Sequence, residues 1–219
     1  MKKYIYKAIW KLHRLTSKGY LVIIKPTMKC NLKCPYCSNV IATGKRPVYK
    51  PEHTPEEWVE FLNRFPIPIQ VVSISGGEPQ VYPQINELIA LLLKNGYWVR
   101  VMTNLSLDKI IVTPSYRLTF TATYHGHVPY DEWSANYDSF ISKGYNMLLN
   151  KKFSKKYIRG KSQQFDLIDE QYSDLIGNKI HRWKRNIHNK FVITPDLRVW
   201  TSCLETNHKK TLTQIGEYE

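Results

Sequence analysis

Three closely spaced cysteines are the residues of this sequence best suited to chemistry. Cys30, Cys34 and Cys37 follow one another at spacings of four and three in the segment Met28-Lys-Cys-Asn-Leu-Lys-Cys-Pro-Tyr-Cys-Ser-Asn39. Thiolates are soft ligands that favour zinc, or iron together with sulfide. Cysteines this close together do not pair efficiently in disulfides, so metal or redox chemistry is the better interpretation.

The number of clustered cysteines bears on the kind of metal site. A structural zinc site normally takes four protein ligands arranged as two short pairs. Three clustered thiolates suit a cubane iron–sulfur cluster in which three irons are anchored and the fourth is left open. Cys203 could still complete a four-thiolate zinc site, so a basic zinc-binding nucleic-acid-binding module remains open as the alternative.

A second motif, Gly76-Gly77-Glu78-Pro79, follows the apolar run Ile69-Gln-Val-Val-Ser-Ile-Ser75. Glycine lets a backbone approach a ligand closely, and the carboxyl ends of parallel strands are where such sheets place their sites. The cysteine segment likewise follows an apolar run, at 20–26. Each motif thus comes directly after a predicted strand, where a functional loop is expected.

The elements that must position these motifs alternate between strands and helices. Short apolar, β-branched runs predict strands, and amphipathic runs with capping residues predict helices. The strands are expected at 20–26, 69–75, 97–103, 118–124 and 146–149, and the helices from Thr54, at 85–94 and at 131–143. This alternation predicts a parallel sheet with right-handed crossovers.

The two ends of the chain follow other patterns. Residues 1–15 are predicted to form a basic amphipathic helix, because their apolar residues recur at helical spacing. Lysine and arginine interrupt the apolar run that a signal peptide would need. A further helix is expected at 165–176, and a strand, turn and strand over 190–200. We therefore expect one α/β domain over 1–219: a partial (β/α)6-type TIM barrel with a core at about 20–150 and an extension at about 151–219 that ends in a short β element.

The paired motifs resemble those of the radical S-adenosylmethionine (SAM) superfamily. The likeness rests on a Cys-x-x-x-Cys-x-aromatic-Cys loop after the first strand and Gly-Gly-Glu-Pro after the second, and it covers roughly residues 20–150. It implies that Cys30, Cys34 and Cys37 hold a [4Fe-4S] cluster whose open iron binds SAM. It also implies reductive cleavage of SAM to a 5′-deoxyadenosyl radical, hydrogen abstraction from a substrate, and an external electron donor of flavodoxin or ferredoxin type.

The same resemblance assigns residues around SAM. It implies that Tyr36 lies against the adenine, and that Gly76, Gly77, Glu78 and Pro79 receive the methionyl amine. Thr103-Asn104 stands where the family often has Thr-Asn-Gly, which makes Asn104 a cofactor-binding residue, and Leu105 replaces the glycine.

A weaker correspondence is Thr123-Tyr-His125-Gly126, which resembles a Ser-x-His-Gly pattern after strand four. It implies that Thr123 bonds the ribose or carboxylate of SAM and that His125 faces the substrate, as a candidate catalytic residue. The plainer interpretations are a threonine chosen for strand propensity and a turn histidine without a role.

The C-terminal segment resembles the start of the extensions that bind auxiliary clusters in many peptide-modifying members of the family. Those extensions carry several cysteines, whereas this one carries only Cys203, so no auxiliary cluster is expected without a partner chain. Cys203 is read first as a small buried residue. Its catalytic alternative is a hydrogen-atom donor or a covalent substrate anchor.

The charge bears on partners. The 32 lysines and arginines outnumber the 18 acids and give a net charge of +14, which favours an anionic or macromolecular substrate. Segments 151–159 and 181–185 interleave cations with aromatic residues, a composition that suits nucleic acid or a solvated surface. A peptide, a nucleotide or nucleic acid, a small metabolite and a glycyl radical enzyme to be activated all remain candidate substrates. No run is long and apolar enough for a transmembrane segment, and a cytoplasmic location is expected.

Overall fold

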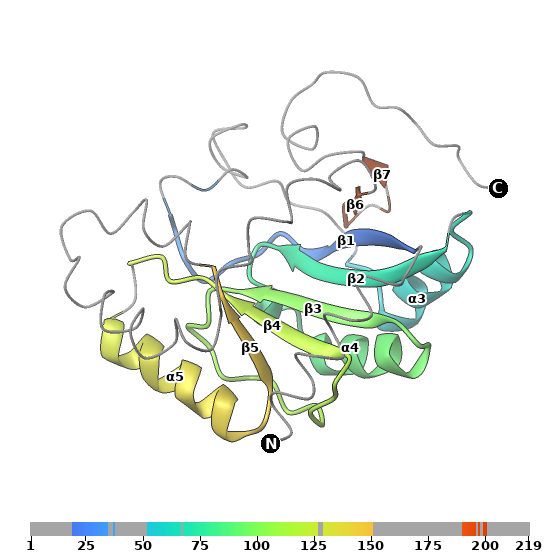
Figure 1. Cartoon of the computed structure of the whole chain (residues 1–219). Coiled ribbons are helices and arrows are strands. Elements are labelled where there is room, and N and C mark those ends of the chain that lie inside the picture. The colour runs from blue at the N-terminus through green and yellow to red at the C-terminus, as the bar shows by residue number, and fades with distance from the viewer. Residues whose placement is uncertain are drawn as a thin grey trace.

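The structure, a computed structural model, describes residues 19–34, 37, 52–66, 68–126, 129–150, 190–195, 197 and 199–200. In chain order the elements are β1 (Tyr20–Thr27), α3 (Pro55–Asn63), β2 (Ile69–Gly76), the short 3-10 helix η1 (Pro79–Val81), α4 (Ile85–Lys94), β3 (Trp98–Thr103), β4 (Leu118–Ala122), α5 (Tyr130–Ser142), β5 (Asn146–Leu149), β6 (Lys190–Ile193) and β7 (Val199–Trp200). Figure 1 shows the strands as one curved sheet.

The seven strands pair in the order β5-β4-β3-β2-β1-β6-β7. All neighbours are parallel except β7, which runs antiparallel to β6. The first five strands therefore follow one another across the sheet, as in a partial (β/α) barrel. In a barrel that continues in chain order, the sixth strand would pair with β5. Here β6 instead pairs in parallel with β1, on the other side of the sheet.

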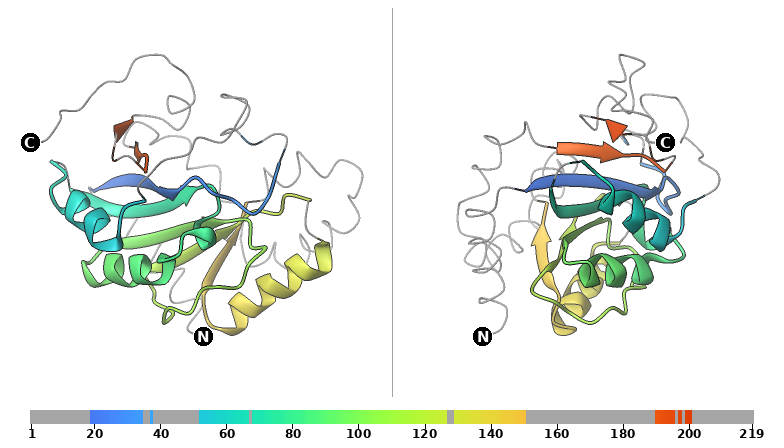
Figure 2. Two further views of the ribbon diagram at one scale, coloured as in Figure 1. Left: turned by 180° about the vertical axis from the view of Figure 1, so that it is seen from behind. Right: turned by 90° about the vertical axis from the view of Figure 1, so that its right-hand side faces the viewer.

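One face of the sheet carries the hydrophobic core. Strand side chains alternate between the two faces, so every second residue of a strand can be buried against helices. Val72 and Ile74 of β2, Val99 of β3 and Phe120 of β4 are fully buried in one cluster with residues of α3, α4 and α5. Helices α3, α4 and α5 lie on this side of the sheet (Figure 2).

Local sequence signals explain where the helices begin and end. Thr54 caps α3 with a capping box, since its hydroxyl accepts from Glu57 N at 3.3 Å and Glu57 Oε2 accepts from Thr54 N at 2.7 Å. At the end of α4, Gly96 takes a positive φ of 89° that closes the helix. Within the described residues no helix has the length and apolar composition needed to cross a bilayer.

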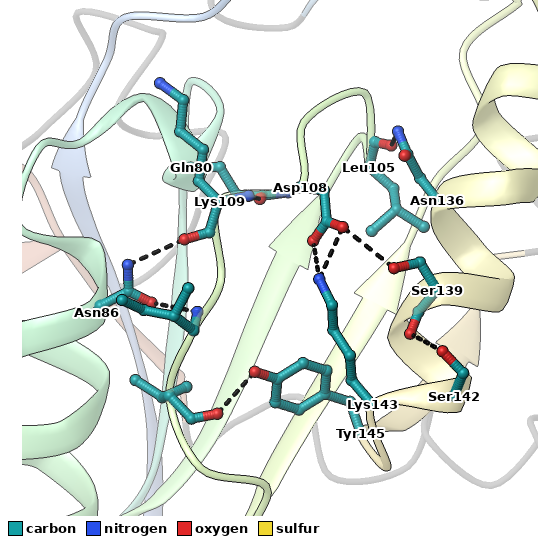
Figure 3. Close-up of polar contacts among 12 residues, drawn as sticks. Gln80, Asn86, Leu105, Asp108, Lys109, Asn136, Ser139, Ser142, Lys143 and Tyr145 are labelled. Carbon is teal, nitrogen blue, oxygen red and sulfur yellow. Dashed lines mark hydrogen bonds and ion pairs between the residues drawn. The ribbon is translucent and has the colours of Figure 1, made fainter.

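The connection between β3 and β4 departs from strand–helix alternation, because residues 104–117 contain no helix. Side chains of the flanking helices hold this segment instead (Figure 3). Asn86 of α4 bonds the backbone of residues 109 and 111 at 3.0 and 2.9 Å, and Lys143 after α5 forms an ion pair with Asp108 at 2.6 Å. The segment thus acts as a brace between α4 and α5.

The fold class expected from the sequence is confirmed, and each predicted strand and helix that the structure describes is present within three residues of its expected bounds. The C-terminal β extension is present as β6 and β7. The helices predicted at 1–15 and 165–176, and the basic segments 151–159 and 181–185, lie outside the described residues.

Candidate active site

The carboxyl ends of β1 to β4 meet at one edge of the sheet, and backbone hydrogen bonds tie the loops that leave them. Gly77 N donates to Thr27 O at 2.9 Å, and Glu78 N donates to Lys29 O at 2.9 Å. These bonds fasten the loop after β2 to the start of the cysteine loop. On the neighbouring pair, Thr123 N donates to Thr103 O at 2.9 Å.

The two glycines of Gly-Gly-Glu-Pro allow this close contact. A Cβ on Gly77 would lie 1.9 Å from Lys29 O, and a Cβ on Gly76 would lie 2.3 Å from Thr27 O. Gly76 also has a φ of 117°, a conformation that side-chain-bearing residues rarely adopt. Neither position can therefore carry a side chain unless the cysteine loop moves away.

Glu78 is only 1% exposed, and its carboxylate joins the ends of β2 and β3. Oε2 accepts from Asn104 N at 2.7 Å, and Oε1 accepts from Thr103 Oγ1 at 2.7 Å and from Gln80 N at 3.1 Å. Burial raises the pKa of Glu78 to about 7, against these donors, which lower it. The carboxylate is therefore a fixed acceptor that sets the position of the Thr103-Asn104 backbone.

Leu105 stands where the family often has glycine, and its backbone adopts a conformation that glycine favours. Its φ is 57°, so it adopts the left-handed conformation that glycine takes readily and that costs an L-residue about 1–2 kcal/mol. Its side chain is 0% exposed within the core. Leu105 N donates to Thr103 Oγ1 at 2.9 Å, and Asn136 Nδ2 of α5 donates to Leu105 O at 3.0 Å. Burial and these bonds offset the backbone strain.

The three cysteines lie at this same edge of the sheet and form no disulfide. Cys34 is buried, whereas Cys30 and Cys37 are half-buried. Leu32 N donates to Cys30 Sγ at 3.4 Å, and Cys37 N donates to Cys34 O at 3.1 Å, which curls the loop. Across the part of the chain that the structure describes, no three Cys, His, Asp or Glu side chains converge closely enough to hold a metal ion.

A family model for the radical SAM superfamily matches residues 24–114, which include the cysteine loop and Gly-Gly-Glu-Pro. Residues 24–114 of the chain belong to the radical SAM superfamily. This membership agrees with the resemblance found in the sequence and accounts for both motifs at one edge of the sheet.

Two curated relatives are similar to part of this chain. The PqqA peptide cyclase of Streptomyces rochei is 31% identical over 84 residues, which is 38% of this chain and 22% of that protein. The PqqA peptide cyclase of Bradyrhizobium diazoefficiens is 32% identical over 93 residues, or 42% and 23% of the two chains. The matched stretch thus spans less than a quarter of these relatives.

Solved structures share the fold. Streptococcus suis SuiB bound to the precursor peptide SuiA superposes with a TM-score of 0.51 at 16% identity, covering 95% of this chain and 65% of SuiB. BtrN in complex with AdoMet and 2-DOIA superposes with a TM-score of 0.54 at 13% identity, covering 90% and 77%. These likenesses show that most of the chain shares the fold of the two structures.

The residues of this site fit the [4Fe-4S] cluster and SAM that the matched family implies. The donor set is three thiols on one loop, the right chemistry for iron and sulfide. The glycine pair gives the backbone contact between this loop and β2 that a side chain would prevent. The fit rests on donor chemistry and on this contact.

The other predicted site residues divide into those the structure describes and those it does not. Thr123 is buried and His125 half-buried, and both follow β4 at the edge that carries the cysteine loop. Their roles toward SAM and substrate stay predictions. Tyr36 and Cys203 lie outside the described residues.

A polar cluster lies beside the cysteine loop and was not predicted from the sequence. Thr27 Oγ1 donates to Glu52 Oε1 at 2.6 Å and accepts from Lys29 N at 3.1 Å. Lys29 Nζ forms an ion pair with Glu52 Oε2 at 3.2 Å. Thr27 directly precedes the loop and could have been noticed for that reason, whereas Glu52 lies 25 residues away with no motif to mark it.

The face of the sheet opposite the helices is polar, which was not predicted from the sequence either. Ser73 of β2 pairs in register with Arg100 of β3, which pairs with Thr119 of β4 and, through it, with Asn146 of β5. Within the described residues, Ser73 Oγ, Thr121 Oγ1 and Asn146 Oδ1 are buried with no hydrogen-bond partner. Such atoms call for a water molecule or a polar ligand. The threonines at alternate positions of β4 could have indicated this polar face from the sequence.

Proposed function

We propose that this chain is a radical SAM enzyme that modifies a peptide. The enzyme part rests above all on one observation, the close packing of Gly77 against Lys29, which joins the Gly-Gly-Glu-Pro segment to the cysteine loop. The peptide part is supported by the similarity to two PqqA peptide cyclases, and the fold shared with SuiB, solved with a precursor peptide, is compatible with it.

Cys30, Cys34 and Cys37 would hold the cluster, and the Gly76–Pro79 backbone would receive the methionyl part of SAM. A cluster and SAM held there would supply one-electron chemistry, with the electron coming from an external donor, for abstracting a hydrogen atom from the substrate. The protein's own task is to orient these partners. Glu78 fixes the ends of β2 and β3, and the glycine pair keeps the cysteine loop against them.

The test is anaerobic turnover with SAM and a one-electron donor against separate pools of short peptides, nucleic acid and small metabolites. Formation of 5′-deoxyadenosine together with a mass change confined to the peptide pool is the expected result. Turnover confined to the nucleic-acid or metabolite pool would overturn the peptide assignment while leaving the enzyme class intact.

A matched set of cysteine variants separates the enzyme from a zinc-binding module. We expect Cys30→Ala to lose iron, sulfide and SAM cleavage, and Cys203→Ala to retain the iron, because only the first removes a proposed cluster ligand. A protein that binds zinc through all four cysteines would lose metal in both variants and would cleave no SAM.

A further inference from the structure

We infer that Asn104 positions and electronically tunes the Cys30 thiolate, by aiming an amide N–H at its sulfur. This inference rests on the proposed function, because it requires that Cys30 holds the cluster. It assigns to Asn104 a task directed at the cysteine ligand rather than at SAM. The contacts that carry it come from β3, the cysteine loop, the 104–117 segment and α5.

The orientation of the Asn104 carboxamide is set by its neighbour Ser106. Ser106 N donates to Asn104 Oδ1 at 2.9 Å, and Ser106 Oγ donates to the same oxygen at 2.6 Å. A backbone N–H can only donate, so the atom facing it must be the oxygen. The amide nitrogen therefore faces the other way.

On that other side lie the cysteine loop and its sulfur. Asn104 Nδ2 is 3.1 Å from Asn31 Oδ1 and 4.0 Å from Cys30 Sγ. Asn31 Nδ2 in turn donates to Ser106 Oγ at 2.6 Å, which closes a ring of polar contacts. At 4.0 Å the contact is at the far limit of a hydrogen bond to sulfur, so the N–H acts on Cys30 mainly as an aimed dipole.

The backbone of Asn104 is anchored as firmly as its side chain. Asn104 N donates to Glu78 Oε2 at 2.7 Å, and Trp133 Nε1 of α5 donates to Asn104 O at 2.8 Å. Leu105, in its left-handed conformation, turns the chain away immediately afterwards. Each polar group of Asn104 thus has a defined partner, and the amide cannot turn from Cys30 without breaking several bonds.

An N–H directed at a cluster thiolate stabilises the more negative, reduced state and so raises the reduction potential. Because the contact is at the far limit of a hydrogen bond, its contribution lies at the low end of the ordinary range and changes the ratio of reduced to oxidised cluster by about threefold. For a one-electron couple this corresponds to about 30 mV. The direction of the shift follows from the N–H pointing toward the sulfur.

The test is a reductive titration of the reconstituted cluster, followed by electron paramagnetic resonance, in Asn104→Ala and Asn104→Asp. We expect both potentials to be more negative than that of the wild type. The shift should be larger in Asn104→Asp, because a carboxylate oxygen replaces the donor. Asn86→Ala is the matched control: it removes an asparagine amide that holds the same 104–117 segment at residues 109 and 111, and the potential of this variant should not change.

Unchanged potentials in both Asn104 variants, or an equal shift in Asn86→Ala, would overturn the inference. If the Asn104 variants retain no iron, Ser106→Ala decides, since it loosens the amide without removing it. A smaller shift of the same sign supports the inference, and an unchanged potential contradicts it. A wild-type protein that assembles no cluster would instead contradict the proposed function.

Discussion

Replacing Leu105 tests whether its backbone conformation is the one the structure shows. Its φ of 57° costs a residue with a side chain about 1–2 kcal/mol, while its fully buried side chain contributes to the core. Truncation of a buried leucine to alanine typically costs about 2–5 kcal/mol. Leu105→Ala loses the packing and keeps the strain, whereas Leu105→Gly loses the packing and relieves the strain.

We therefore expect both variants to be less stable than the wild type, and the glycine variant to be more stable than the alanine variant by about 1 kcal/mol. Leu92 is the matched control, because it is equally buried but lies inside α4. In a helix interior alanine is more stable than glycine by about 1 kcal/mol. The order of the two variants should thus reverse between positions 105 and 92.

The assay is urea unfolding of the metal-free protein, with thermal unfolding as a second readout. A difference of 1 kcal/mol shifts the melting temperature of a protein of this size by about 2–4 °C. An alanine variant at position 105 that is at least as stable as the glycine variant would refute the left-handed conformation and the account of how Asn104 is held.

Three further substitutions test the site. Gly77→Ala should abolish SAM binding, measured by equilibrium dialysis on the reconstituted protein, because its Cβ would lie 1.9 Å from Lys29 O; normal binding would show that the contact is dispensable. Burial raises the pKa of Glu78 to about 7, above its unfolded value of 4.5, so stability should fall as pH rises from about 4.5 to 7. Glu78→Gln should flatten this slope in urea unfolding, and an unchanged slope would contradict the raised pKa. Trp133→Phe leaves Asn104 O without its donor and should cost about 1–3 kcal/mol in the same assay, whereas wild-type stability would exclude that bond as a support.

The strands and helices were predictable because their signals are local. The Thr54 capping box, the glycine after α4 and the short β-branched runs each fix an element through its neighbours in sequence. The pairing of β6 with β1 was not predictable in this way, because strand order depends on contacts between segments far apart in the chain. No helix was expected between β3 and β4, but the long-range side-chain bonds that hold this segment, such as those of Asn86, could not be predicted from the sequence.

The same difference between local signals and long-range contacts applies to the residues of the site. Cys30 and Gly77 stand in motifs whose spacing carries chemistry, and the structure places their loops in contact. Leu105 could be marked from the sequence as a departure from the family pattern, but its left-handed backbone is stabilised by Asn136 of α5, 31 residues away. The Glu52–Thr27 contact has no sequence signal, since a single acid at a distance resembles any surface carboxylate.

The most direct test of the central claim is to reconstitute the wild-type protein and Cys30→Ala anaerobically with iron and sulfide, and to assay both for SAM cleavage with dithionite. The account predicts that the wild type acquires a [4Fe-4S] cluster with its paramagnetic signature on reduction and converts SAM to 5′-deoxyadenosine, and that the variant does neither. A wild-type protein that remains colourless, binds zinc in place of iron and leaves SAM intact would contradict it.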